Sequence, residues 1–195
     1  GTATVTERPG AAPRRTAFRV NSPIDVDGTR VFLVGNGYAP VVTVTDGEGR
    51  VAFSGPVPFM PRDGKYTSVG VVKVPDAEPR QIGLQGLFLP TAVIDPVQGP
   101  ISIFPDTTDP RLFLTAFVSR PGEDGLGMDS GVPQSVYVLE TKNLVQLQAG
   151  DGPLRAQLGV GQTLTLPDGA GTVRFDGIKR YAALDVRHDP AKGWV

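Results

Sequence analysis

Residues 41–55 read VVTVTDGEGRVAFSG, and they decide the fold class. Val42 and Val44 alternate with threonines before the DGEG segment, and Val51 and Phe53 alternate with small or polar residues after it. A period of two is typical of a β-strand with one buried face, and glycine supplies the positive φ that a tight turn needs. The stretch therefore predicts a β-hairpin.

The rest of the chain has the same character. Short apolar runs are separated by turns, and 25 glycines and 19 prolines are spread along the 195 residues. We expect about ten to twelve strands. Residues 76–94 allow one short helix, but Pro79, Gly83 and Gly86 argue against a long one. The predicted fold class is mostly β: a single antiparallel β-sandwich or partly open barrel with long Gly/Pro-rich loops and little helix.

Two local predictions concern the C-terminal half. Residues 135–140 (SVYVLE) and 144–150 (LVQLQAG) are predicted to pair as a hairpin across the TKN segment. The last strand is predicted over residues 179–190 (KRYAALDVRHDP). Because side chains alternate along a strand, His188 would share an apolar face with Leu184.

The composition excludes several classes of function. The formal net charge of −1 gives no basic field for nucleic acid or an anionic membrane. The chain has no cysteine, which excludes disulfides, thiolate metal sites and a cysteine nucleophile. It has one histidine, so a multi-histidine metal site is excluded and a Ser-His-Asp triad would have to use His188.

Hydropathy sets the expectation for membranes. No stretch approaches the roughly 18 apolar residues of a membrane span. Residues 1–10 lack the charged-then-apolar pattern of a secretion signal. If the protein works in a membrane assembly, we expect this chain to be a soluble piece of it.

Glycine-rich and acidic segments have a simple structural explanation. The segments GNG, GEG and GLGMDSG lack the strand–loop–helix setting and the lysine of a phosphate-binding loop. Asp106 and Asp109, and the cluster of Glu123, Asp124 and Asp129, match no calcium loop and are typical of turns and solvated surface. We therefore expect no catalytic residue and no metal site.

His188, Met60 and Met128 are the remaining candidate ligands, because imidazole and thioether groups bind heme iron or copper. Two isolated methionines more often pack in a core. A lone histidine on an apolar strand face is more often a hydrogen-bonded structural residue. Both interpretations stay open for each of the three side chains.

Several long segments carry a family resemblance. They are residues 21–61 (NSPIDVDGTRVFLVGNGYAPVVTVTDGEGRVAFSGPVPFMP), 70–92 (GVVKVPDAEPRQIGLQGLFLPTA), 104–117 (FPDTTDPRLFLTAF), 125–141 (GLGMDSGVPQSVYVLET) and 161–186 (GQTLTLPDGAGTVRFDGIKRYAALDV), followed by HDP. Each is longer and more irregular than a generic turn pattern. Over nearly everything between residues 20 and 190, the sequence resembles the extracytoplasmic domain of the ResB family, also called CcsB.

The resemblance implies a function that composition does not show. ResB-like proteins are polytopic membrane proteins of cytochrome c biogenesis, with a large domain outside the cytoplasm between their last two membrane helices. They work with a partner, ResC or CcsA, to move heme outward and attach it to the reduced CXXCH cysteines of apocytochrome c. By this resemblance the chain lies at the cell membrane on the extracytoplasmic, periplasmic side, and heme is handled by the complex rather than bound by this domain.

The resemblance does not give His188 a catalytic role. The heme-ligating histidines of the family lie mainly in membrane helices and in the partner, so none carries over. Related sequences have a histidine before the GYAP segment, where this chain has Asn36. At the position of His188, related sequences have other residues too.

The family resemblance and the lack of catalytic residues together predict a docking module that is not an enzyme on its own. It would bind apocytochrome c and a ResC/CcsA-type membrane partner through the loops 56–66, 95–110 and 119–134. Two alternatives remain: direct heme binding through His188 or a methionine, and an unrelated extracellular β-sandwich for ligand binding or adhesion. The candidate docking residues are Pro58, Phe59, Phe104, Asp106, Asp124, Met128 and Asp129.

Three segments are expected along the chain. Residues 1–17 would form a loosely ordered N-terminal segment, residues 18–190 the ResB-like β domain, and residues 191–195 a stub leading to a missing transmembrane helix. Lys192 and Trp194 are residue types that favour the membrane–water interface, so we expect both to be membrane-proximal.

Overall fold

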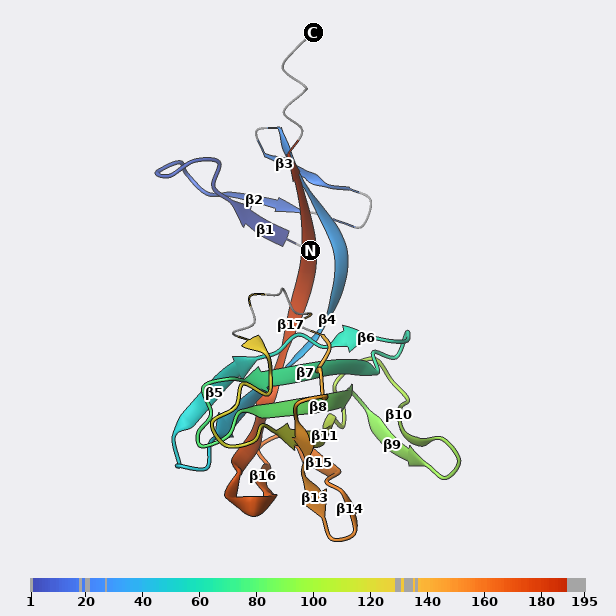
Figure 1. Ribbon diagram of the computed structural model, residues 1–195. Helices are drawn as coiled ribbons and strands as arrows, with labels where there is room; N and C mark the ends of the chain where they lie inside the picture. The colour runs from blue at the N-terminus through green and yellow to red at the C-terminus, as the bar shows by residue number, and fades with distance from the viewer. Residues whose placement is uncertain are drawn as a thin grey trace. The chain divides into compact units, whose positions relative to one another are not determined.

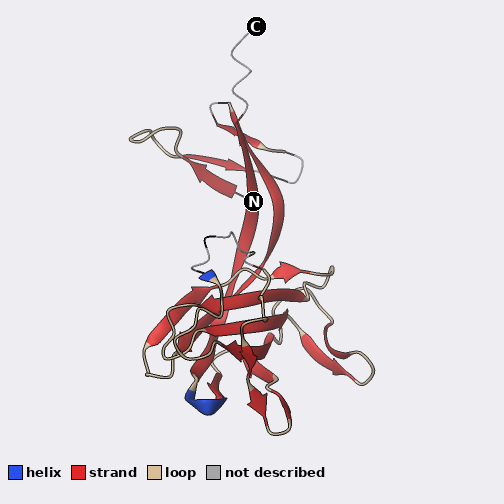
Figure 2. Cartoon of the chain, viewed as in Figure 1, coloured by secondary structure: helices blue, strands red, loops and turns tan. Residues whose placement is uncertain are grey.

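The computed structural model describes residues 2–17, 19, 22–26, 28–128, 131, 135 and 137–188. Strands dominate it, and helical turns are short (Figure 2); the 3-10 turn η2 spans Pro167–Gly169. Among these residues no sheet closes into a barrel. The predicted class, mostly β with little helix, is therefore confirmed.

Two larger sheets and three two-stranded sheets contain the strands (Figure 1). The first larger sheet has the order β12-β11-β8-β7-β6, with β15 also paired to β11, and the second has the order β16-β17-β4-β3, with β5 also paired to β4. The strands of the first sheet are β6 (Met60–Pro61), β7 (Ser68–Val74), β8 (Ile82–Leu89), β11 (Arg111–Val118), β12 (Val145–Gln146) and β15 (Ala156–Gly159). Those of the second are β3 (Ile24–Val26), β4 (Thr29–Thr45), β5 (Val51–Pro56), β16 (Thr163–Leu166) and β17 (Gly171–His188). The two-stranded sheets pair β1 (Thr2–Val5) with β2 (Arg14–Ala17), β9 (Ala92–Asp95) with β10 (Gly99–Ser102), and β13 (Gln148–Ala149) with β14 (Gly152–Pro153).

The chain forms two compact units. The smaller unit contains residues 1–36 and 181–195, and the larger unit contains residues 37–180. The long strands β4 and β17 contribute residues to both. In the smaller unit, β1 and β2 pair in register from Thr2 with Ala17 to Val5 with Arg14. The division into a loose segment, a β domain and a stub stays a prediction, and residues 189–195 lie outside the described part of the chain.

The core of the larger unit lies between the inner faces of the two larger sheets. The strands β7, β8 and β11 give it alternate residues, as the alternation in the sequence requires. Phe88 from the first sheet and Phe175 from the second meet edge to face, with ring centroids 6.3 Å apart. The other nearly inaccessible side chains of this core include Val42, Val44, Val74, Ile82, Leu84, Leu112, Ala116, Val118 and Val173. Two packed antiparallel faces of this kind make a sandwich.

Phe59 lies in a slot made by two glycines of the first sheet. Gly70 of β7 and Gly86 of β8 are cross-strand partners, and a Cβ atom on either would overlap the Phe59 ring. The Phe59 side chain is buried, at 1% exposure, and its backbone N–H donates to the Tyr38 carbonyl of β4 at 3.0 Å. Burial of such a side chain contributes about 1.5–3 kcal/mol. Glycine is therefore needed at both positions for packing.

The β4–β5 hairpin predicted from residues 41–55 is confirmed. Val42 pairs with Gly55 and Val44 with Phe53, and the register shifts after Val44. The carboxylate of Asp46 lies inside the turn at 2% exposure. It accepts hydrogen bonds from the backbone N–H groups of Glu48, Arg50 and Glu78 at 3.0, 2.9 and 3.2 Å, and from the Arg50 guanidinium at 3.3 Å. Asp46 thus fastens the hairpin to the segment before β8.

Two local expectations are wrong. The described residues of 135–140 form no hairpin with residues 144–150, because β12 pairs with β11 and β13 with β14. The described residues 137–140 are not in a strand; Leu139 is buried against Val71 and Phe117 on the first sheet instead. Seventeen strands are described rather than ten to twelve, since several have two residues, too few for a period of two to show. Residues 76–94, which could have held one short helix, contain β8 and no helix.

The pKa of Asp46 predicts how stability depends on pH. Burial raises this pKa, but the backbone N–H groups of Arg50, Glu78 and Glu48 and the charge of Arg50 outweigh burial, so the pKa lies below its ordinary value of 3.8. A depressed carboxyl pKa stabilises the fold above the unfolded-state pKa, and this contribution is lost as pH falls through the folded-state value.

We therefore expect Asp46→Asn to lower the free energy of unfolding by about 2–3 kcal/mol at pH 7, because an amide –NH₂ would face N–H donors. Urea unfolding monitored by circular dichroism measures this change. Below pH 3.8 the difference from the unsubstituted chain should shrink. Asp151→Asn, at an exposed position, is the matched control. Equal losses for both variants would show that the Asp46 hydrogen bonds do not hold the turn.

Candidate docking surface

The β9–β10 hairpin presents a short loop whose backbone is fixed by Asp95. The strands pair from Ala92 with Ser102 to Asp95 with Gly99. One carboxylate oxygen of Asp95 accepts the N–H groups of Val97 and Gln98, both at 2.8 Å. These two bonds, that of Gln98 first, hold the pKa of the Asp95 carboxyl below its usual value. Gly99 has φ of +79°, which closes the loop at low cost only with glycine.

This hairpin and the residues after it expose an unusual amount of apolar side chain. Val97 at the tip is 94% exposed, Ile94 is 60% exposed, and Ile103 and Phe104 are each 50% exposed. Val93 is also exposed. Isolated exposed apolar residues are normal, but five of them within twelve consecutive residues make this hairpin a candidate interaction surface. We call residues 93–104 the apolar hairpin.

The base of the apolar hairpin is anchored to the second sheet through Tyr38. The Tyr38 hydroxyl donates to the Pro105 carbonyl at 2.9 Å and accepts from the Arg180 guanidinium at 2.8 Å. The same guanidinium contacts the Asp106 carboxylate at 3.1 Å and lies 5.0 Å from the centroid of the Tyr38 ring. Tyr38 itself is buried and packs its ring against Phe88. The two residues after Phe104 are therefore held in place, Pro105 by Tyr38 and Asp106 by Arg180.

A second anchor lies on the other side of Phe104. The buried Ser102 hydroxyl lies 3.1 Å from the carbonyl oxygens of Lys65 and Phe104. The Thr91 hydroxyl donates to the Asp106 carbonyl at 2.7 Å. Apolar side chains on such a fixed backbone can bind a partner without first ordering a loop, which lowers the entropic cost of binding.

The structure separates the seven candidate docking residues. Phe104 and Pro58 are exposed, and Asp106 is exposed but paired with Arg180. The prediction that Phe59 is a docking residue is wrong. Its ring is buried in the slot between Gly70 and Gly86, so it cannot contact a partner. Asp129 lies outside the described residues.

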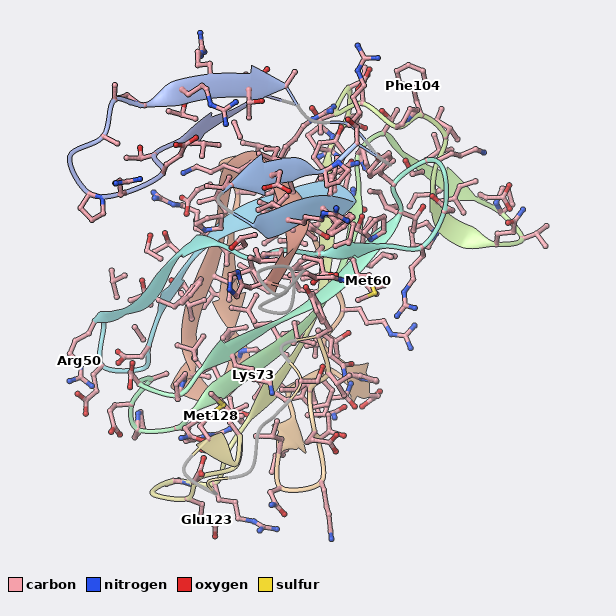
Figure 3. The ribbon with its side chains drawn as sticks, turned by 90° about the horizontal axis from the view of Figure 1, so that it is seen from above. Arg50, Met60, Lys73, Phe104, Glu123 and Met128 are labelled. Carbon is pink, nitrogen blue, oxygen red and sulfur yellow. The ribbon has the colours of Figure 1, made fainter. Side chains whose placement is uncertain are left out.

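Asp124 and Met128 belong to a different region from the apolar hairpin. Both are exposed, and an Asp124 carboxylate oxygen accepts the Met128 N–H at 3.2 Å. Figure 3 shows Met128 and Phe104 at opposite ends of the larger unit. Met128 and Phe104, which come from two of the predicted docking loops, therefore do not share one surface.

The three candidate heme ligands are all exposed. His188 ends β17 in the smaller unit, and its Nδ1 lies 3.0 Å from the Thr29 hydroxyl. It shares the solvent-exposed face of β17 with Leu184 and Val186, so it does not face a core. Met60 and Met128 lie apart in Figure 3. Within the described part of the chain, no group of three or more histidine, aspartate or glutamate side chains could hold a metal ion.

The sequence predicted a docking loop over residues 95–110 and named Phe104, but it did not single out the other exposed apolar side chains of the hairpin or the anchoring residues Tyr38, Arg180 and Thr91. A signal for the hairpin exists: residues 91–104 (TAVIDPVQGPISIF) contain one charged residue, Asp95. The anchors have no such signal, because Tyr38 and Arg180 are 142 positions apart and meet only in the folded chain.

Removing the Tyr38 hydroxyl tests the anchor. Tyr38→Phe leaves the Pro105 carbonyl and the Arg180 guanidinium without their shared partner. This loss should lower the free energy of unfolding by about 1–2 kcal/mol. Amide hydrogen exchange of residues 103–108 should become faster, while exchange in β8 stays unchanged. Tyr137→Phe, at an exposed position, is the control. Unchanged exchange at residues 103–108 would contradict the anchoring role.

Comparison with known proteins assigns the chain to a family. A family model described as ResB-like family matches residues 2–195. No curated protein and no solved structure matches the chain. ResB proteins are membrane-associated, and no helix in the described residues is long and apolar enough to cross a membrane. The family match overturns the alternative of an unrelated extracellular module. The chain belongs to the ResB-like family and has a role related to cytochrome c biogenesis.

Proposed function

We propose that this chain is the extracytoplasmic domain of a membrane cytochrome c biogenesis protein and that it docks apocytochrome c and a ResC/CcsA-type partner for heme delivery and attachment. The observation that carries the proposal is the apolar hairpin, with Val97 and Phe104 exposed on a fixed backbone. Its family role requires contact with other proteins, and this hairpin has the chemistry of a contact surface.

A few side chains, often aromatic, supply most of the binding free energy of an interface, and a preorganised backbone lowers the entropic cost of binding. Phe104 would enter a pocket of the partner, and Ile94, Val97 and Ile103 would exclude water around it. The Arg180–Asp106 pair lies next to this surface and would form part of its polar rim. Rim charges of this kind influence orientation more than affinity.

The absence of cysteine supports the same role. The sequence contains no thiol, so the domain cannot form mixed disulfides with the reduced CXXCH cysteines of an apocytochrome held beside it. Lys192 and Trp194 would lie near the membrane surface, where such residue types are favoured. Both lie outside the described residues, so their position is part of the proposal.

Binding measurements on the purified chain test the docking proposal. We expect it to bind a CXXCH-bearing apocytochrome c fragment or an outer segment of the membrane partner. Phe104→Ser should weaken that binding about tenfold or more, since truncation at the centre of an interface costs at least 1–2 kcal/mol.

Val160→Ser is the matched control. The side chain of Val160 is 49% exposed, close to the 50% of Phe104, but Val160 lies in the loop before β16. Equal affinity for the Phe104→Ser variant and the unsubstituted chain would rule out the apolar hairpin as the docking surface. No association with either protein would contradict docking altogether.

Direct heme binding at His188 is a second candidate function, supported by the setting of its ring. If Nδ1–H donates to the Thr29 hydroxyl, Nε2 keeps a free lone pair on an exposed face. Leu184 and Val186 share that face and offer apolar contact to a flat ligand. Heme would supply an iron centre that accepts an imidazole ligand.

Hemin titration followed by absorbance separates this candidate from simple docking. Coordination predicts a shift of the Soret band that is lost in His188→Ala and retained in Met60→Leu and Met128→Leu. A Soret band that stays at the position of free hemin would exclude a ligand in this domain. A shift that survives His188→Ala would exclude His188 as that ligand.

A further inference from the structure

A groove of about 520 Å³ crosses the outer face of the first sheet, the face turned away from the core. Leu87 of β8 and Phe113 of β11 are cross-strand partners and line it, and Pro100 of β10 forms one side. Four polar side chains complete the lining: Gln85, Thr115, Arg155 and Gln157. An apolar hollow with a few polar groups is the usual form of a binding site.

The neighbouring part of the same sheet face is covered by apolar side chains of the chain itself. There, Leu126 and Leu139 from irregular segments pack on Val71 and Phe117, and their side chains fill the space above Gly83. The chain thus covers one half of this face with leucines that are not part of any strand.

Leu87 and Phe113 lie four residues along β8 and β11 from Gly83 and Phe117, on the same face by strand alternation. Both are half-buried, and they line an open groove rather than a covered one. The apolar surface continues from the covered part into the groove, so a further segment with an aliphatic side chain would complete the cover.

The polar lining adds a preference for negative charge. Arg155 is the one charged side chain that lines the groove, and no acidic group lies beside it there. Among the described residues, its guanidinium makes no hydrogen bond or ion pair, and the same holds for the side chains of Gln85, Thr115 and Gln157. A carboxylate on the occupant would give Arg155 a charge-assisted, bidentate partner.

We propose that this groove binds an extended peptide segment of a partner protein, with one aliphatic side chain on Leu87 and Phe113 and one carboxylate on Arg155. Phe113 pairs with Gln157, and Arg155 is two residues from Gln157. Side chains two residues apart in an extended peptide share a face, about 6.5–7 Å apart. The recognised pattern is therefore an aliphatic residue and an acidic residue separated by one position.

This inference goes beyond the proposed docking function, since it concerns the outer sheet face, which the apolar hairpin borders only through Pro100, and does not require the partner to be apocytochrome c. The test uses the whole chain and a fluorescein-labelled synthetic hexapeptide. The peptide has leucine at its third position, glutamate at its fifth, and serine or threonine elsewhere. A second peptide has glutamine in place of the glutamate, and a third has lysine there.

Fluorescence polarisation should show saturable binding of the glutamate peptide below about 1 mM. The glutamine peptide, and the Arg155→Gln chain, should each bind roughly tenfold more weakly. Arg155→Glu should reverse the preference and bind the lysine peptide best, a result that a merely damaged chain cannot give. Lys179→Gln on β17, which removes a positive charge at an exposed position away from the groove lining, is the control that should leave binding unchanged.

Three outcomes would overturn the proposal: no saturation with any peptide, equal affinity for the glutamate and glutamine peptides, or no reversal in the Arg155→Glu chain. Self-association of the chain that Arg155→Gln abolishes in sedimentation would also overturn it, because the occupant would then be a second copy. None of these results affects the docking proposal, which rests on Phe104 and Val97.

Discussion

The larger unit depends on the placement of one phenylalanine ring over two glycines. The ring of Phe59 needs the space that Gly70 and Gly86 leave on the first sheet, and its backbone N–H bonds to Tyr38 on the second sheet. The packing of the two sheets and the position of Tyr38 are thus linked. Tyr38 in turn holds the Pro105 carbonyl and the Arg180 guanidinium. The exposed side chain of Phe104 is therefore positioned by contacts that begin in the core.

The two faces of the first sheet serve different purposes. The inner face packs against the second sheet and stabilises the fold through burial of apolar side chains. The outer face is covered in one part by Leu126 and Leu139 and forms an open groove in another. The hairpin β9–β10 borders this groove through Pro100 and carries exposed Val97 at its tip. Surfaces available for binding thus lie at the ends and on the outside of a rigid sandwich, as is common for recognition domains.

The sequence predicted the parts of the fold that repeat with a short period. The mostly β class and the β4–β5 hairpin follow from alternating residues such as Val42 and Val44 and from the DGEG turn. Leu139 shows the limit, because its apolar neighbours suggested a strand while tertiary packing placed it over Gly83. A local sequence pattern predicts that one side of a segment is buried, but it does not say which element packs against that side.

The site was harder to predict than the fold for the same reason. Phe59 follows a proline and Phe104 precedes one, and both lie in loops that look alike in sequence. Only the folded chain shows that Phe59 is buried and Phe104 is exposed. Heme ligands and docking partners depend on other proteins, so the family match gives the biological process while the contacts remain a proposal.

Site-specific photo-crosslinking in the intact membrane complex tests the central claim most directly. A benzophenone amino acid would replace Phe104 or Val97, with Val160 as the control position of similar chemistry on another loop. The docking account predicts crosslinks from positions 104 and 97 to apocytochrome c or to the membrane partner, and none from position 160. Crosslinks from position 160 alone, or none from the apolar hairpin while the complex still matures cytochrome c, would contradict it.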